Sequence, residues 1–205
     1  NGYYNHRYLP KDDGYFKNSK MKSPSDLIEY DFDTDVEINV PGDWNTQMEK
    51  LYYYEGTVWY KKSFNYKVDA GSMNYLYFGA ANYDAKVYLN GEYLGSHIGG
   101  YTPFQFDVTG KLKEKDNFLV VKVDNKRKRE AVPTVNTDWW NYGGITRSVD
   151  IISVPKMHVS DYMIQLAKGN ANTIEGSVTV TGSKINDAVT VEIPELKQVL
   201  KLKVD

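Results

Sequence analysis

The sequence predicts an all-β protein, and three observations lead to this fold class. Beyond the first 35 residues, apolar and polar residues alternate over short segments, which is the pattern of strands with one buried face. Gly, Asn, Asp, Ser and Pro gather between these segments and mark turns. No segment keeps an apolar period of about 3.6 residues long enough to indicate a helix.

The composition indicates a folded protein with a neutral or polar partner. A chain of 205 residues has the length of one domain, or of one complete domain and part of another. The formal net charge of -2 gives no strong field that would select nucleic acid or an anionic membrane, so neither is expected as a partner. Aromatic residues reach 14%, with 18 tyrosines, and such rings stack on sugars as well as filling cores.

No metal or cofactor is expected. The chain has no cysteine, which excludes disulfides, thiol nucleophiles and cysteine-bound zinc. Its three histidines, His6, His97 and His158, are too far apart in sequence to form a His-x-His or His-x-x-x-His group. The basic run Lys-Arg-Lys-Arg at 126–129 has no stacking platform or groove helix beside it, so we interpret it as a solvated loop.

Residues 1–34 are expected to form an extended arm that packs on the neighbouring domain. They combine turn-forming residues with several tyrosines but have no sustained period. The chain starts at Asn1 rather than at a methionine, which indicates that an upstream segment has been removed, whether a secretion signal, a tag or an arbitrary boundary. A periplasmic or secreted location is favoured if that segment is a signal peptide.

Residues 35–155 are expected to form one jelly-roll or related sandwich domain. The turn signals divide this region into eight short strands, and eight is the number that a jelly roll requires. The expected strands are 36–40, 57–67, 74–80, 84–89, 92–95, 102–108, 117–124 and 146–154.

Asn90-Gly91 gives the clearest local signal. This dipeptide suits a type I′ two-residue turn, because both central positions of that turn need a positive φ. Pairing outward from the turn predicts three cross-strand pairs, which are Leu89 with Glu92, Tyr88 with Tyr93, and Val87 with Leu94.

Residues 156–205 alternate more regularly and are expected to form an incomplete immunoglobulin-like β-sandwich. Four strands are expected, at 156–166, 174–181, 189–193 and 200–204, each with one buried and one solvated face. An immunoglobulin-like sandwich needs about seven strands. We therefore expect the chain to be a fragment of a longer protein.

Five segments, in this order, resemble the N-terminal part of glycoside hydrolase family 2, with the β-glucuronidases nearest and the β-galactosidases next. The resemblance spans roughly residues 35–155, and the order of the motifs makes it more specific than any one of them. The segments are VPGDWN at 40–45, YYEGTVWYKKSF at 53–64, DAKVYLNGEYLGSHIGGYTPFQFDVT at 84–109, NFLVVKVDN at 117–125 and DWWNYGGITRSVDI at 138–151.

The resemblance implies a galactose-binding-like jelly roll, then an immunoglobulin-like sandwich, then a catalytic (β/α)₈ barrel. It implies a retaining β-glycosidase that uses one glutamate as acid/base and another as nucleophile. Both glutamates belong to the barrel in this family, so no catalytic residue is expected in this chain and the chain alone is expected to be inactive. The implied partners are a β-linked sugar and the barrel of the same protein.

Asp138 matches a family aspartate that reaches from the jelly roll into the active site and hydrogen-bonds a sugar hydroxyl. A carboxylate accepts hydrogen bonds through two oxygens, which suits neighbouring hydroxyls. From the residues alone, Asp138 is a loop acid that caps nearby backbone amides. Trp139 and Trp140 are further candidates for sugar contact, with packing at a domain junction as the alternative for at least one of them.

A free-standing carbohydrate-binding module is the alternative function. An independent binder is expected to be a closed domain, whereas this sequence stops within the second sandwich, which favours the enzyme fragment. The sequence does not select one β-glycoside, because the residues that read the distinguishing groups of the sugar are expected in the barrel.

Overall fold

A computed structural model describes residues 36–182, 184 and 187–204, so the expected arm at 1–34 lies outside the described residues. Strands dominate this part of the chain, and its longest helix has four residues, which confirms the all-β fold class. The chain divides into two compact units. The first contains the described residues up to Asp69 together with Asn74–Ile152, and the second contains Ala70–Met73 and the residues from Ser153 onward.

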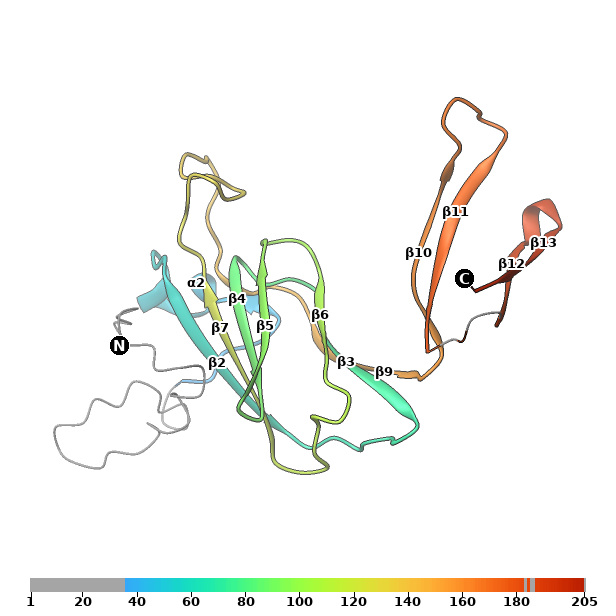
Figure 1. Cartoon of the computed structure of the whole chain (residues 1–205). Helices are drawn as coiled ribbons and strands as arrows, with labels where there is room; N and C mark the ends of the chain where they lie inside the picture. Colours follow the sequence, from blue (N-terminus) through green and yellow to red (C-terminus); the bar gives the residue numbers. More distant parts are fainter. Residues whose placement is uncertain (1–35, 183, 185–186, 205) are drawn as a thin grey trace. The chain divides into compact units, whose positions relative to one another are not determined.

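Two main sheets build the first unit. The four-stranded sheet has the order β2-β7-β4-β5, with every neighbouring pair antiparallel, and the three-stranded sheet has the order β6-β3-β9 (Figure 1). A further pair, β1 with β8, lies outside them. The strands are β1 (Gly42–Asp43), β2 (Thr57–Phe64), β3 (Ser72–Phe78), β4 (Asp84–Leu89), β5 (Glu92–Ile98), β6 (Phe104–Asp107), β7 (Asn117–Asp124), β8 (Gly144–Ile145) and β9 (Val149–Pro155).

The two sheets share one hydrophobic core. Val87 and Leu89 on β4 belong to the same buried cluster as Leu76 and Phe78 on β3. In each pair the two residues are two positions apart, and residues at this spacing point to the same face of a strand. The apolar residues that alternate with polar ones in the sequence therefore lie on the inner face of a β-sandwich.

The hairpin at Asn90-Gly91 forms as predicted, except for the third cross-strand pair. Asn90 and Gly91 have φ values of 51° and 94°, as the type I′ turn requires. The first two pairs are confirmed, but the third is wrong, because Val87 pairs with Gly95 across a register shift. A β-bulge therefore leaves Leu94 as the extra residue, and Leu94 packs against the core.

The expected strand at 36–40 is wrong. The backbone of Asn39 bonds a side-chain amide instead of a neighbouring strand: its N–H donates to Gln47 Oε1 at 2.9 Å, and Gln47 Nε2 donates to its carbonyl at 3.1 Å. Gln47 ends the short helix α2 (Trp44–Gln47), which Asp43 caps by accepting from the Thr46 backbone N–H at 2.7 Å. A 3₁₀ turn, η2 (Glu49–Leu51), follows.

The second unit contains two hairpins that form separate two-stranded sheets. β10 (His158–Leu166) pairs with β11 (Ile174–Thr181), and β12 (Ala188–Ile193) pairs with β13 (Gln198–Lys203), with η3 (Pro194–Leu196) between the latter two. The four expected strands are confirmed. The expected burial of one face is wrong for β10 and β13, whose side chains are almost all exposed, because each described hairpin forms a two-stranded sheet of its own.

Among the described residues of the chain, no helix is both long and apolar enough to cross a membrane.

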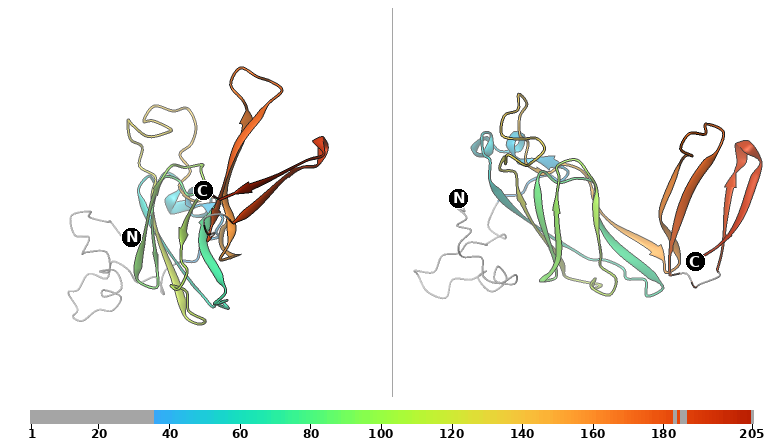
Figure 2. Two further views of the ribbon diagram at one scale, coloured as in Figure 1. Left: turned by 45° about the vertical axis from the view of Figure 1, so that its right-hand side comes forward. Right: turned by 45° about the horizontal axis from the view of Figure 1, so that its top comes forward.

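The segment between β7 and β8 projects past the end of β7, as Figures 1 and 2 show, and it carries the predicted site residues. We call residues 126–140 of this segment the 126–140 loop.

Candidate functional site

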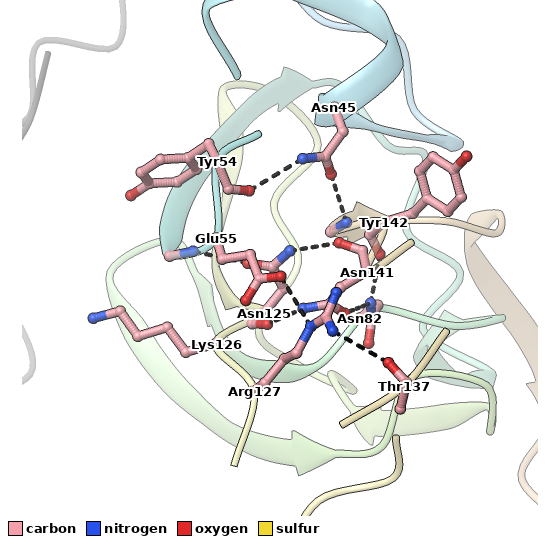
Figure 3. A network of polar contacts seen from close by, with 12 residues as sticks. Asn45, Tyr54, Glu55, Asn82, Asn125, Lys126, Arg127, Thr137, Asn141 and Tyr142 are labelled. Atoms are coloured by element: carbon pink, nitrogen blue, oxygen red, sulfur yellow. Dashed lines mark hydrogen bonds and ion pairs between the residues drawn. The ribbon is translucent and has the colours of Figure 1, made fainter. Parts of the chain in front are cut away.

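Two buried asparagines close the base of the 126–140 loop. Asn125 follows β7 directly, and Asn141 lies where the chain returns from the loop. Asn125 Nδ2 donates to the Asn141 carbonyl at 2.9 Å, and Asn141 Nδ2 donates to the Asn125 carbonyl at 2.5 Å (Figure 3). This reciprocal amide bridge satisfies polar groups that would otherwise be costly to bury.

Two further asparagines extend the bridge into an amide network, which we define as Asn45, Asn82, Asn125 and Asn141. Asn82 Nδ2 donates to Asn141 Oδ1 at 3.2 Å and to the Tyr142 carbonyl. Asn45 Oδ1 accepts from the Gly143 N–H at 2.9 Å. All four side chains are buried, so the network fixes the loop base to segments that are distant in sequence.

Gly143 permits the close approach on which this base depends. A Cβ added at Gly143 would lie 2.1 Å from Cζ2 of the Trp44 ring and 2.5 Å from Asn125 Nδ2. The Gly143 carbonyl also accepts from the Trp44 N–H at 2.9 Å. No side chain fits here, so the glycine in this motif is a packing requirement of the loop base.

The structure places Asp138 on the exposed part of the loop. Its side chain is exposed, and its carboxylate has no hydrogen-bond or ion-pair partner among the described residues. The interpretation of Asp138 as a cap for nearby backbone amides is therefore wrong in this structure. An exposed carboxylate with both oxygens unpaired is able to accept hydrogen bonds from a ligand.

The two adjacent tryptophans have different surroundings. Trp140 is 38% exposed and packs on the rings of Tyr52 and Tyr53, with centroid distances of 5.1 and 5.5 Å. Trp139 is 59% exposed and makes no ring contact in the described part of the chain. Trp140 thus has a packing role within the first unit, whereas Trp139 presents a free ring beside Asp138.

The sequence interpretation missed three polar residues at this loop. Arg127 Nε lies 2.9 Å from Glu55 Oε1, and Arg127 Nη1 donates to Thr137 Oγ1 at 3.2 Å (Figure 3). The prediction of a solvated basic run is therefore wrong for Arg127, although Lys126, Lys128 and Arg129 are exposed as expected. An arginine in a loop that also contains aromatic residues was the available signal, but its partner Glu55 is distant in sequence.

In the described part of the chain, the polar side-chain partner of His97 is the Thr102 hydroxyl, and His97 has no ion-pair partner there. It lies on β5, its Nε2 is 3.1 Å from Thr102 Oγ1, and its ring stacks on Phe104 with a centroid distance of 4.3 Å. Partial burial lowers the pKa of His97, and a backbone contact with Gly99 opposes this shift. Among the described residues, no three His, Asp or Glu side chains gather as a metal site would need.

The fold and the loop together define a class of protein. The chain is a β-sandwich that presents an unpaired acid and an exposed aromatic ring on a loop beyond its sheets, within the described residues. The comparison with known families agrees, because residues 13–155 match the model described as "Glycosyl hydrolases family 2, sugar binding domain". The chain belongs to glycoside hydrolase family 2.

Individual relatives support the same assignment. The chain is 38% identical over 115 residues to a beta-glucuronidase of Formosa agariphila, covering 52% of this chain and 12% of that protein. It is 36% identical over 134 residues to a beta-galactosidase of Thermoanaerobacter pseudethanolicus, covering 62% of this chain and 18% of that protein. The chain thus spans less than a fifth of either relative.

A solved structure shares the fold of the chain. The beta-glucuronidase of Bifidobacterium dentium, in complex with coumarin-3-O-glucuronide, is 28% identical and superimposes with a TM-score of 0.65. The alignment covers 82% of this chain and 34% of that chain.

Proposed function

We propose that this chain is the N-terminal, non-catalytic portion of a retaining β-glycosidase of the β-glucuronidase or β-galactosidase type. In such an enzyme two carboxylic acids about 5–5.5 Å apart cleave the glycosidic bond, one as acid/base and one as nucleophile. No glutamate of this chain is assigned either role. The catalytic pair belongs to a barrel domain of the complete protein, and the substrate is a β-linked sugar.

The unpaired carboxylate of Asp138 carries this proposal. It lies on a loop whose base the amide network holds in place, so the side chain is presented without the ordering cost that a free loop would have. Asp138 accepts a hydrogen bond from a hydroxyl of the bound sugar, and this bond strengthens when the site excludes water. Trp139 stacks on a face of the sugar ring, while Trp140 anchors the loop by packing on Tyr52 and Tyr53.

An activity assay tests the proposal. The complete protein is expected to hydrolyse nitrophenyl β-glucuronide or nitrophenyl β-galactoside, and the 205-residue chain alone is expected to hydrolyse neither. Reproducible turnover by the pure 205-residue chain would contradict the placement of the catalytic glutamates in the barrel. The relative rates on the two substrates identify the sugar.

A free-standing carbohydrate-binding module is the second candidate, and the exposed ring of Trp139 is the observation that favours it. Such a module binds sugar without any further domain. Isothermal titration of the 205-residue chain with glucuronate and galactose separates the two functions, since only the module is expected to release heat of binding.

A further inference from the structure

We propose that Arg127 is a positioning residue for Asp138, which it holds in place through Thr137. Arg127 connects Glu55, which lies before β2, to Thr137, which directly precedes Asp138. The inference rests on the proposed contact between Asp138 and the sugar. It gives Arg127 a role in a reaction that the residue does not itself touch.

The bond to Thr137 is distinctive because the exposed end of the loop makes so few others. Residues 135–140, which we call the 135–140 limb, make one hydrogen bond in the described part of the chain, and it is the bond from Arg127 Nη1 to Thr137 Oγ1. The other constraints on this limb are the ring contacts of Trp140 and the bridge at Asn141. In the sequence, Asp138 lies between Thr137 and these two constraints. Loss of the Thr137 bond therefore leaves the backbone of Asp138 constrained on its C-terminal side alone.

Glu55 provides a fixed point for the arginine. Its neighbour Gly56 donates its N–H to Asn125 Oδ1 at 2.8 Å, inside the buried amide network. The contacts therefore form a continuous series. It runs from the loop base to Glu55, then to the guanidinium of Arg127, and then to Thr137 (Figure 3). The planar guanidinium faces Glu55 through Nε and donates to Thr137 through Nη1, a two-sided geometry that a compact lysine ammonium does not reproduce.

The arrangement acts on geometry more than on folding stability. The side chains of Arg127 and Glu55 are 24% and 38% exposed, and ion pairs that reach solvent contribute little to folding. A catalytic or binding group that shifts by about 1 Å, in contrast, lowers a rate by up to roughly 100-fold. Removing the Thr137 bond is therefore expected to change kcat/KM much more than it changes the unfolding temperature.

Matched substitutions in the complete protein test the inference. Thr137→Val keeps the shape of the side chain and removes the acceptor, and Thr137→Ser keeps the hydroxyl. Arg127→Met removes both contacts, and Arg129→Met is the control from the same basic run, because the Arg129 side chain is exposed and has no polar partner in the described part of the chain. We expect Thr137→Val and Arg127→Met to lower kcat/KM by about 10-fold, with Thr137→Ser and Arg129→Met within about twofold of the unsubstituted protein.

A double-mutant cycle with Asp138→Ala separates positioning from a general structural role. If Arg127 acts through Asp138, Arg127→Met causes no further loss once Asp138 is alanine. An equal loss in both backgrounds, or a Thr137→Val variant with unchanged kcat/KM, overturns the inference. An unchanged kcat/KM for Asp138→Ala overturns the proposed sugar contact itself, so the two failures are distinguishable.

Discussion

At the base of the 126–140 loop the side chains of Asn125 and Asn141 are buried and hydrogen-bonded to each other's carbonyl, whereas at its 135–140 limb the carboxylate of Asp138 and the ring of Trp139 are exposed and unpaired within the described part of the chain. Substituting a buried, satisfied amide leaves its partners without hydrogen bonds, so the base determines stability. Substituting an exposed, unpaired group costs the fold little. The two ends of one loop thus divide stability and recognition between them, and substitutions at each end test this division.

The largest effect is expected at Gly143, in the base. Gly143→Ala places a Cβ 2.1 Å from the Trp44 ring, which forces the ring or the backbone to move. We expect a loss of about 3 kcal/mol in the free energy of unfolding, measured by urea denaturation. Gly110→Ala is the control: it has a positive φ of 76° but nothing within 4 Å of the added Cβ, so only strain of about 1 kcal/mol is expected. Equal losses at both positions would contradict the close-packing explanation.

The amide bridge comes next. Asn125→Ala removes the donor to the Asn141 carbonyl and the acceptor for the Gly56 N–H, both of which stay buried. The expected loss is about 2 kcal/mol in the free energy of unfolding. Asn136→Ala, an exposed asparagine of the same loop, should change it by less than about 0.5 kcal/mol. If the two variants unfold at the same urea concentration, the base is not the stabilising end of the loop.

At the 135–140 limb the effect is expected on catalysis alone. Asp138→Ala in the complete protein should lower kcat/KM by an amount equivalent to about 1–3 kcal/mol of lost hydrogen bonding. Asp138→Asn keeps one acceptor oxygen and is expected to lose less. Both variants should unfold at the temperature of the unsubstituted protein, because the exposed Asp138 side chain has no hydrogen-bond or ion-pair partner in the described part of the chain. A lowered unfolding temperature with unchanged kcat/KM would reverse the assignment of the two ends.

The smallest effect distinguishes the two tryptophans. Trp140→Ala removes ring contacts with Tyr52 and Tyr53, and aromatic pairs contribute about 0.5–1.5 kcal/mol each. A loss of about 1 kcal/mol in the free energy of unfolding is expected, against less than about 0.5 kcal/mol for Trp139→Ala. Urea denaturation of the two variants side by side measures the difference, and a larger loss at Trp139 would contradict it.

The features that were predictable from the sequence are those that neighbouring residues determine. Asn90-Gly91 specifies its own turn, and the first two cross-strand pairs follow from it. The bulge at Gly95 is not predictable in this way, because the ring of Phe106, from another strand, occupies the space that a Cβ at Gly95 would need. Local signals thus determine the elements, while contacts between distant strands determine their register.

The candidate site divides in the same manner. Asp138, Trp139 and Trp140 are predictable because they form one continuous motif that resembles a known family. The network of Asn45, Asn82, Asn125 and Asn141 draws on four separate segments, and an isolated asparagine in a sequence resembles any turn residue. Arg127 was interpreted as solvated for the same reason, since its partner Glu55 lies far away in the sequence.

The reciprocal bridge between Asn125 and Asn141 also has a consequence for protein engineering and for divergence within a fold. The two ends of this loop are held by hydrogen bonds to each other. Residues between them can therefore be inserted or deleted without moving the strands that the loop joins. Doubling the length of such a loop costs only about 0.6 kcal/mol of closure entropy. Segments of other lengths and compositions are therefore exchangeable between Asn125 and Asn141, and new ligand preferences are accessible at little cost to the sandwich beneath.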